Sequence, residues 1–185
     1  MNVFLIIILV FLVGSYFLDL LVETLNMRHA ETRLPEEFRG VYDAESYRRS
    51  QSYLKENTRF GILEQSMITP IVIAFILLGG FNHVDVFARG FGWGPIPTGL
   101  VFAGVLLLGY HLLTIPFSIY QTFVIEEKYG FNRTTAWTFL LDILKGWLLA
   151  AVLGGIMLSA VLEFFHKAGD WAWLYCWLAF LAFQG

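Results

Sequence analysis

Apolar residues along this chain gather in five long stretches, and the segments between them carry most of the charged residues. A helix needs about 20 mostly apolar residues to cross the core of a bilayer. We therefore predict helices at about 3–25, 62–78, 96–120, 137–165 and 171–185. The fold class that this pattern predicts is an all-α, polytopic membrane protein.

Two of these stretches depart from a plain membrane span. Pro70 lies inside the second, where a proline leaves a helical carbonyl without its usual donor, so we expect a kink there. The fifth is apolar only from 171 to 183, about 20 Å of helix against a bilayer core of about 30 Å. We expect the chain to be a piece cut inside its fifth helix.

The connection at about 26–61 is predicted to be partly helical. Asp43 is a plausible N-cap, and no glycine or proline follows it before Gly61. Tyr53 and Phe60 lie seven residues apart, which is typical of one helix face. Such a helix could rest on lipid headgroups or pack on a cytoplasmic domain. The segment 81–95, rich in glycine and aromatic residues, is expected to be a loop at the membrane interface.

Composition excludes several classes of protein. The chain is 57% hydrophobic and 15% charged, which argues against a soluble enzyme and against a disordered chain. The single cysteine, Cys176, excludes an internal disulfide. A net charge of −3 without a Lys/Arg run gives no basic patch, so we expect a lipid bilayer and no nucleic acid as partner.

The charges of the connections predict an orientation. Lys and Arg number seven in 26–61, one in 81–95, two in 121–136 and one in 166–170. Positive residues are enriched in cytoplasmic loops. We therefore expect the N-terminus outside and the first and third connections in the cytoplasm. The membrane would be the inner membrane of a bacterium or the endoplasmic reticulum of a eukaryote.

Ionisable residues inside the predicted spans are the candidates for function. Asp142 and Lys145 are three apart on one helix face and can pair. They form either a structural ion pair or part of the wall of a water-filled chamber, because neither charge is stable alone in hydrocarbon. His111 is either a hydrogen-bonded interhelical residue or a catalytic one. The charged residues Glu126, Glu127 and Lys128 are expected to form a solvated cluster.

Motifs of hydrolytic and nucleotide-binding sites are absent from the sequence. Its four histidines include no His-Glu-x-x-His pair, and no Cys/His cluster has the spacing of a zinc site. There is no Gly-x-Ser-x-Gly elbow, phosphate loop or dinucleotide fingerprint. We therefore predict no catalytic residue, no cofactor-binding residue and no metal ligand in this chain.

One part of the sequence carries a specific resemblance. Three patterns follow one another: Pro-Phe-x-x-Tyr, Phe-Val-Ile-Glu-Glu-Lys-x-Gly-Phe-Asn and Asp-x-x-Lys. They fall on Pro116, Tyr120, Glu126, Glu127, Lys128, Gly130, Phe131, Asn132, Asp142 and Lys145. Together with Leu-Pro-Glu-Glu-Phe at 34–38, they closely resemble the N-terminal membrane region of the type I CAAX prenyl proteases. These are integral-membrane zinc metalloendopeptidases.

The resemblance implies a seven-helix barrel around a large chamber, with the zinc motif beyond the fifth helix. Residues 1–185 would then be the N-terminal transmembrane domain, lacking the C-terminal catalytic domain and inactive alone. Zinc, and a peptide or lipidated protein substrate, are expected only for the full-length enzyme. The matching residues would be chamber-wall or structural positions.

Two other functions remain open from the sequence. One is a non-enzymatic membrane scaffold or partner-binding protein. The other is a transporter or channel subunit that uses Asp142, Lys145 and His111 as a polar path. A zinc motif in the coding sequence beyond Gly185 would exclude the scaffold, and solute flux in liposomes would support the transporter.

Overall fold

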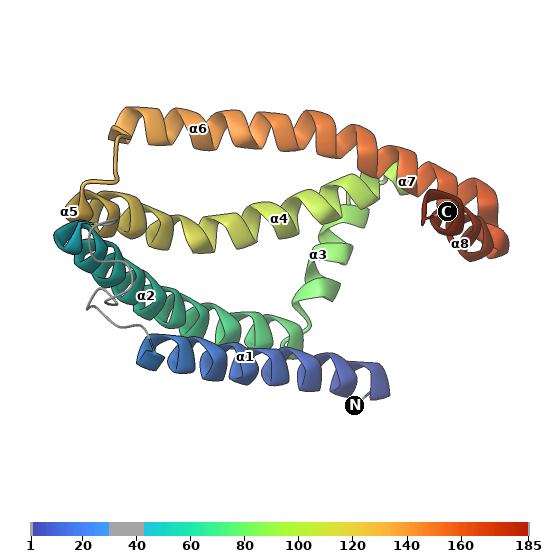
Figure 1. The fold of residues 1–185 in the computed structure, drawn as a ribbon. Coiled ribbons are helices and arrows are strands. Elements are labelled where there is room, and N and C mark those ends of the chain that lie inside the picture. Colours follow the sequence, from blue (N-terminus) through green and yellow to red (C-terminus); the bar gives the residue numbers. More distant parts are fainter. Residues whose placement is uncertain (1, 30–42, 185) are drawn as a thin grey trace. The chain divides into compact units, whose positions relative to one another are not determined.

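The structure is a computed structural model that describes residues 2–29 and 43–184. The Leu-Pro-Glu-Glu-Phe segment at 34–38 lies outside the described residues. Throughout the described part, every regular element is helical (Figure 1). The elements are α1 (Val3–His29), α2 (Ala44–Leu77), α3 (Gly80–Arg89), α4 (Pro95–Tyr120), η2 (Gln121–Glu126), α5 (Glu127–Tyr129), α6 (Ala136–Leu149), η3 (Ala150–Gly154), α7 (Gly155–Ala168), η4 (Gly169–Trp171) and α8 (Ala172–Gln184).

Four helical runs in the described residues are long and apolar enough to cross a membrane. They are Val3–Arg28, Ala44–Leu77, Pro95–Tyr129 and Ala136–Ala182. Large apolar side chains such as Phe4, Leu107 and Met157 are mostly exposed to the surroundings, as they are in a protein whose solvent is lipid. The prediction of an all-α, polytopic membrane protein is confirmed.

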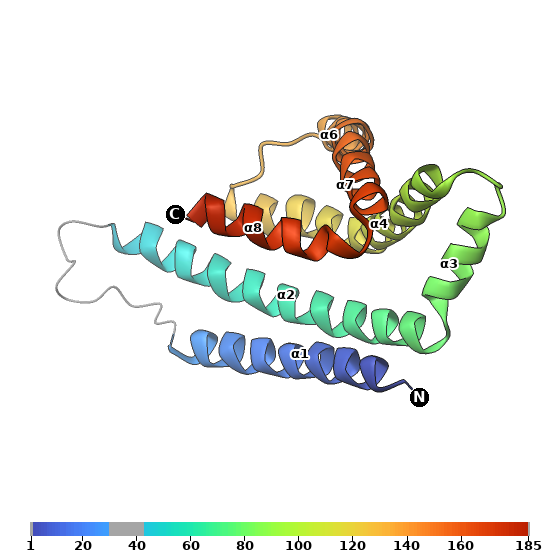
Figure 2. The same ribbon diagram turned by 90° about the vertical axis from the view of Figure 1, so that its right-hand side faces the viewer.

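Contacts divide the chain into two compact units. The first contains Met1–Gly80 and His111–Thr134, and the second contains Phe81–Tyr110 and Thr135–Gly185. Helix α4 therefore contributes its part from His111 onwards to the first unit and its longer part up to Tyr110 to the second unit. In the first unit, α1 and α2 lie side by side along most of their length (Figures 1 and 2).

Helix α2 joins the polar segment before residue 62 and the apolar span after it into one helix. The Oδ2 atom of Asp43 accepts a hydrogen bond from the backbone N–H of Ser46 at 2.9 Å, which caps the first turn. The helix then continues past Pro70 to Leu77 without interruption. The polar first half of α2 is therefore held rigidly to the membrane-spanning half.

The expected loop at 81–95 is wrong in its first part, because α3 lies there. Gly79 and Gly92 have φ of 72° and 66° and bracket the helix and the turn after it. Between them, Phe81, Val84 and Ala88 recur at helical spacing, and Ala88 is fully buried. The segment was predicted to be a loop because it is rich in glycine and aromatic residues, and the amphipathic pattern within it is short.

Helix α4 ends at Tyr120, as expected for the third span, but the loop expected after it is helical at first. The helical path continues through η2 and α5 as far as Tyr129, because no glycine or proline interrupts it before Gly130. A run of charged residues suggested a loop, but charged side chains are compatible with a helix that has left the apolar layer. The helix expected at 137–165 corresponds to α6, η3 and α7, with a π-helical turn at Ala150–Gly154.

In the second unit, a glycine permits a close contact between two helices. A Cβ atom placed on Gly99 of α4 would lie 2.7 Å from Cδ1 of Leu162 on α7. This separation is shorter than any comfortable carbon–carbon contact. A side chain at position 99 would therefore require the end of the Leu162 side chain to move.

Candidate functional site

The candidate site lies where the α4 helical path ends, and we call residues 116–132 the signature segment. Its π-helical turn, η2, is followed by the short α5 and then by Gly130. Gly130 is in the left-handed conformation, with φ 75° and ψ 22°. Its N–H donates to the carbonyl of Glu127 at 3.0 Å, and the N–H of Phe131 donates to the carbonyl of Glu126 at 2.9 Å. This is the usual way in which a glycine ends a helix and turns the chain.

Asn132 stabilises the turn that follows the helix. Its side-chain Nδ2 donates to Oε2 of Glu127 at 3.0 Å. Its Oδ1 accepts a hydrogen bond from the backbone N–H of Thr134 at 2.7 Å. An asparagine at such a position hydrogen-bonds the backbone two residues ahead, which favours a turn over continued helix. Glu127, Gly130 and Asn132 therefore act together to end the helix and direct the chain.

Lys128 and Tyr129 bind the signature segment to the polar half of α2. Nζ of Lys128 lies 2.6 Å from Oε2 of Glu56, and the Tyr129 hydroxyl donates to the same oxygen at 2.7 Å. The ring of Tyr53 meets the ring of Tyr129 edge-on at 5.5 Å and that of Phe131 at 4.8 Å. The Glu56 carboxylate accepts two hydrogen bonds, and two pairs of rings meet edge-on beside it. Together these contacts join segments that are far apart in the sequence.

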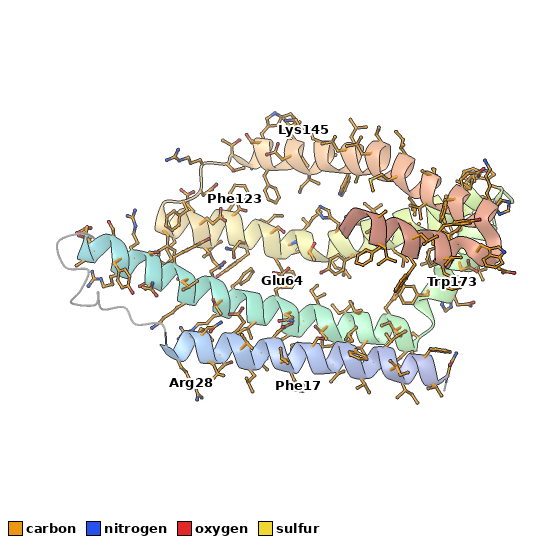
Figure 3. All side chains as sticks on the ribbon, turned by 45° about the vertical axis from the view of Figure 1, so that its right-hand side comes forward. Phe17, Arg28, Glu64, Phe123, Lys145 and Trp173 are labelled. Carbon is orange, nitrogen blue, oxygen red and sulfur yellow. The ribbon has the colours of Figure 1, made fainter. Side chains whose placement is uncertain are left out.

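A second set of contacts lies one turn closer to the apolar span. Nε2 of Gln121 donates to Oδ1 of Asn57. The ring of Tyr120 stacks on that of Phe60 with 4.9 Å between centroids. Ile125 of η2 is almost completely buried, with 1% of its surface exposed. Side chains from α2 and from the end of α4 occupy the space between these two helices (Figure 3).

The electrostatics of the site follow from the shared carboxylate. Glu56 precedes the apolar span that starts at about residue 62, and Lys128 follows the span that ends at Tyr120. The hydrogen bonds from Lys128 and then from Tyr129 lower the pKa of Glu56 below its usual range. The same contact with Glu56 raises the pKa of Lys128 and that of Tyr129. The ion pair is therefore fully charged at neutral pH.

The sequence-based expectations for this region were incomplete. Lys128 and Glu127 were expected to be solvated members of a charge cluster, but each has a specific side-chain partner, Glu56 and Asn132 respectively. Glu56 itself was missed. The helical spacing of Tyr53 and Phe60 could have pointed to it, because Glu56 lies between them on the same half of α2. The first half of α2 packs on the signature segment. The two interpretations from the sequence, a helix on lipid headgroups or on a cytoplasmic domain, did not include this contact.

The other candidate residues do not belong to the signature segment. Asp142 and Lys145 form the expected i,i+3 pair on α6 in the second unit, with Oδ1 and Nζ 3.6 Å apart. Both side chains are more than half exposed. His111 belongs to the first unit, where its backbone carbonyl accepts a hydrogen bond from Oγ1 of Thr114 at 3.0 Å. Their roles remain predictions.

The described residues do not fit a zinc ion. Within residues 2–29 and 43–184, no three His, Cys, Asp or Glu side chains come together as a metal site requires. The interactions of the signature segment are those of a structural joint between helices. The assignment of zinc to another part of a full-length enzyme stays a prediction.

The helical runs and the joint between them define an integral, multi-pass membrane domain. Residues 23–185 match the family described as CAAX prenyl protease N-terminal, five membrane helices. The chain belongs to this family.

Similar proteins extend beyond the region that this chain covers. It is 30% identical over 151 residues to a CAAX prenyl protease 1 homolog from Oryza sativa subsp. japonica, covering 78% of this chain and 36% of the relative. It is 26% identical to a probable CAAX prenyl protease 1 from Schizosaccharomyces pombe, covering 94% and 40%. The chain thus spans about two-fifths of the length of these curated relatives.

A solved structure shows the same fold. The crystal structure of S. mikatae Ste24p matches all of this chain and 44% of that chain, with a TM-score of 0.86 and 24% sequence identity. The fold of this chain is therefore one that occurs in a solved structure.

Proposed function

We propose that this chain serves as the N-terminal membrane domain of a zinc metalloendopeptidase that cleaves CAAX-type, prenylated or membrane-associated proteins. The observation that carries the proposal is the family match over residues 23–185, which includes the whole signature segment. The proposal assigns zinc and the reacting groups to a catalytic part of the full-length enzyme, as the resemblance to the family implies.

In this proposal the described helices form walls of an internal chamber and part of the route for substrate. The joint between α2 and the signature segment would fix the angle of two wall helices. Asp142 and Lys145 support a wet environment beside α6, because an exposed ion pair is costly in hydrocarbon but stable beside water. His111 and Pro116 would be wall positions on α4.

The experiment that tests the proposal is complementation in membranes. The chain is co-expressed with the C-terminal part of the Oryza sativa relative, which begins where the similarity ends. We expect chelator-sensitive cleavage of a prenylated CAAX peptide from the two parts together and none from either part alone. The two matched parts of the relative itself serve as the positive control. Cleavage by that control without cleavage by the mixed pair would contradict the proposal.

A second test is independent of assembly. The coding sequence beyond Gly185 is read for His-Glu-x-x-His on a predicted helix and a later glutamate. The proposal requires both features. A stop codon directly after Gly185 would refute the protease assignment for this protein and favour the scaffold role.

A further inference from the structure

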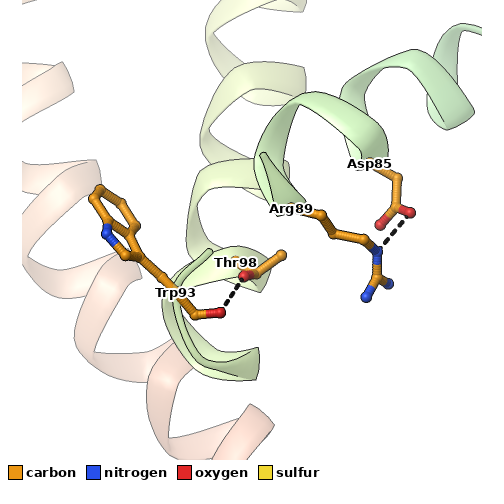
Figure 4. Close-up of polar contacts among 4 residues, drawn as sticks. All are labelled: Asp85, Arg89, Trp93 and Thr98. Atoms are coloured by element: carbon orange, nitrogen blue, oxygen red, sulfur yellow. Dashed lines mark hydrogen bonds and ion pairs between the residues drawn. The ribbon is translucent and has the colours of Figure 1, made fainter. Parts of the chain in front are cut away.

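A hollow lies between α3 and the first turns of α4, entirely within the second unit. Its volume is about 570 Å³, within the range of small-molecule sites. Four of its lining residues carry the argument: Asp85, Arg89, Trp93 and Thr98. Oγ1 of Thr98 donates to the carbonyl of Trp93 at 3.3 Å, which holds the turn between the two helices (Figure 4).

The position of this hollow follows from the topology. Helix α3 connects two successive membrane-spanning helices, α2 ending at Leu77 and α4 beginning at Pro95. A connection between successive spans lies at one surface of the bilayer, at the depth of the lipid headgroups. The topology therefore predicts that the hollow lies at the depth of the lipid headgroups.

Aromatic side chains mark the same depth. The rings of Phe87 and Phe91 meet edge-on at 5.3 Å, and those of Phe91 and Trp93 stack at 4.9 Å. Each of the three is about half exposed. Exposed aromatic residues of this kind are enriched where the acyl chains meet the headgroups. Trp93 lines the hollow, and Phe91 and Phe87 continue from it through these ring contacts.

The charged side of the hollow carries both signs. Nε of Arg89 donates to Oδ2 of Asp85 at 2.8 Å, and the rest of the guanidinium points away from this carboxylate (Figure 4). Arg89 is 70% exposed and Asp85 39%. A guanidinium is well suited to bind phosphate, and a carboxylate is suited to bind an ammonium group. The indole ring of Trp93 points away from both charged side chains (Figure 4). Because Arg89 and Asp85 already compensate each other, an anionic headgroup without an ammonium would leave this site with a net negative charge.

We propose that this hollow binds the headgroup of a zwitterionic phospholipid from the surrounding bilayer. Arg89 takes the phosphate, Asp85 takes the ammonium group, and the acyl chains follow the exposed rings of Trp93 and Phe91, which stack on each other. This inference does not depend on the protease assignment, because it concerns only the surface of the membrane domain.

Native mass spectrometry of the full chain, released from detergent with added lipid, tests the proposal. We expect one phosphatidylethanolamine to be retained in preference to phosphatidylglycerol. Arg89→Gln should weaken retention of phosphatidylethanolamine about tenfold, the loss of a charge-assisted contact. Lys167→Gln is the matched control, because Lys167 forms the same kind of i,i+4 pair with Glu163 but does not line the hollow.

Two further variants make the outcome decisive. Asp85→Asn should abolish the preference for phosphatidylethanolamine over phosphatidylglycerol, and Trp93→Leu should weaken retention of phosphatidylethanolamine. Helix content measured by circular dichroism shows that each variant is folded. Equal retention of the two lipids by the unmodified chain would overturn the zwitterion assignment. Equal loss of lipid in Arg89→Gln and Lys167→Gln would overturn the site.

Discussion

At the scale of single residues, Gly130 decides where the α4 helical path stops. Its φ of 75° lies in the region that side-chain-bearing residues rarely adopt. We expect Gly130→Ala to lower the free energy of unfolding by about 1 kcal/mol. An added Cβ would meet no atom within 4 Å, so the whole effect would come from the backbone. Reversible unfolding of the purified chain in mixed micelles measures this change.

The control for this substitution is Gly146→Ala. Gly146 lies in the interior of α6, where an added Cβ also meets nothing within 4 Å. Alanine is favoured over glycine in a helix, so we expect a gain of up to about 1 kcal/mol. A loss of stability from both substitutions would show that the left-handed conformation of Gly130 is not the cause.

Glu56 is the second residue with a decisive role, because it accepts two donors from the signature segment. We expect Glu56→Gln to lower Tm by about 2 °C or less, since Lys128 and Glu56 are both partly exposed to solvent. The loss should exceed that of Glu163→Gln, whose partner Lys167 lies on the same helix. Equal losses would indicate that Glu56 does not join distant segments in the folded chain.

The pH dependence of this contact has a definite sign. The pKa of Glu56 is lowered in the folded state by its bonds to Lys128 and Tyr129, from an ordinary value of 4.5. The stabilisation is therefore fully present above about pH 4.5 and is lost as the pH falls through the lowered pKa. The difference in Tm between the unmodified chain and Glu56→Gln should accordingly shrink as the medium is acidified below that value.

At the scale of elements, α2 depends on its N-cap because its first half is polar and partly exposed. We expect Asp43→Ala to speed hydrogen exchange of the Ser46 amide about fivefold, because the bond to Oδ2 is lost. Asp43→Asn keeps an acceptor and is the control. The N–H of Ser46 lowers the pKa of Asp43 from 3.8, so acid should also fray this turn as the pH falls through the lowered value.

The ring contacts of α2 explain why its polar half is ordered as a helix. Tyr53 and Phe60 pack on rings of the signature segment, and Asn57 between them accepts a hydrogen bond from Gln121. Short isolated helices are marginal in water, so such packing supplies most of the stability. These contacts therefore stabilise the first half of α2 as a helix and also hold it against the signature segment in the first unit.

At the scale of the whole molecule, the charge of the connections predicts a topology that can be measured. In a background of Cys176→Ser, we expect Ser46→Cys and Asn82→Cys to be labelled from opposite sides of the membrane. Both positions are exposed, and one membrane span separates them. If the N-terminus lies outside, Ser46→Cys lies on the cytoplasmic side. It should then react with a membrane-impermeant reagent only when that reagent has access to the cytoplasmic face. Labelling of both from one side would contradict this topology.

Much of the fold was predictable from the sequence because membrane helices are encoded locally. A long apolar stretch is sufficient to specify a helix in lipid, where every backbone group must be paired within the segment. The family resemblance was likewise visible in a contiguous pattern from Pro116 to Lys145. Helix α3 was missed because it is short and rich in residues that are also common in loops.

The sequence by itself determined the fold class, the approximate spans and the family, since each depends on neighbouring residues or on a compact motif. Only the tertiary structure decided that Lys128 meets Glu56, 72 positions away, and that Asp85, Arg89 and Trp93 line one hollow. Such contacts depend on how helices pack and where the chain turns. Neither hydrophobic periodicity nor charge spacing along the chain contains that information.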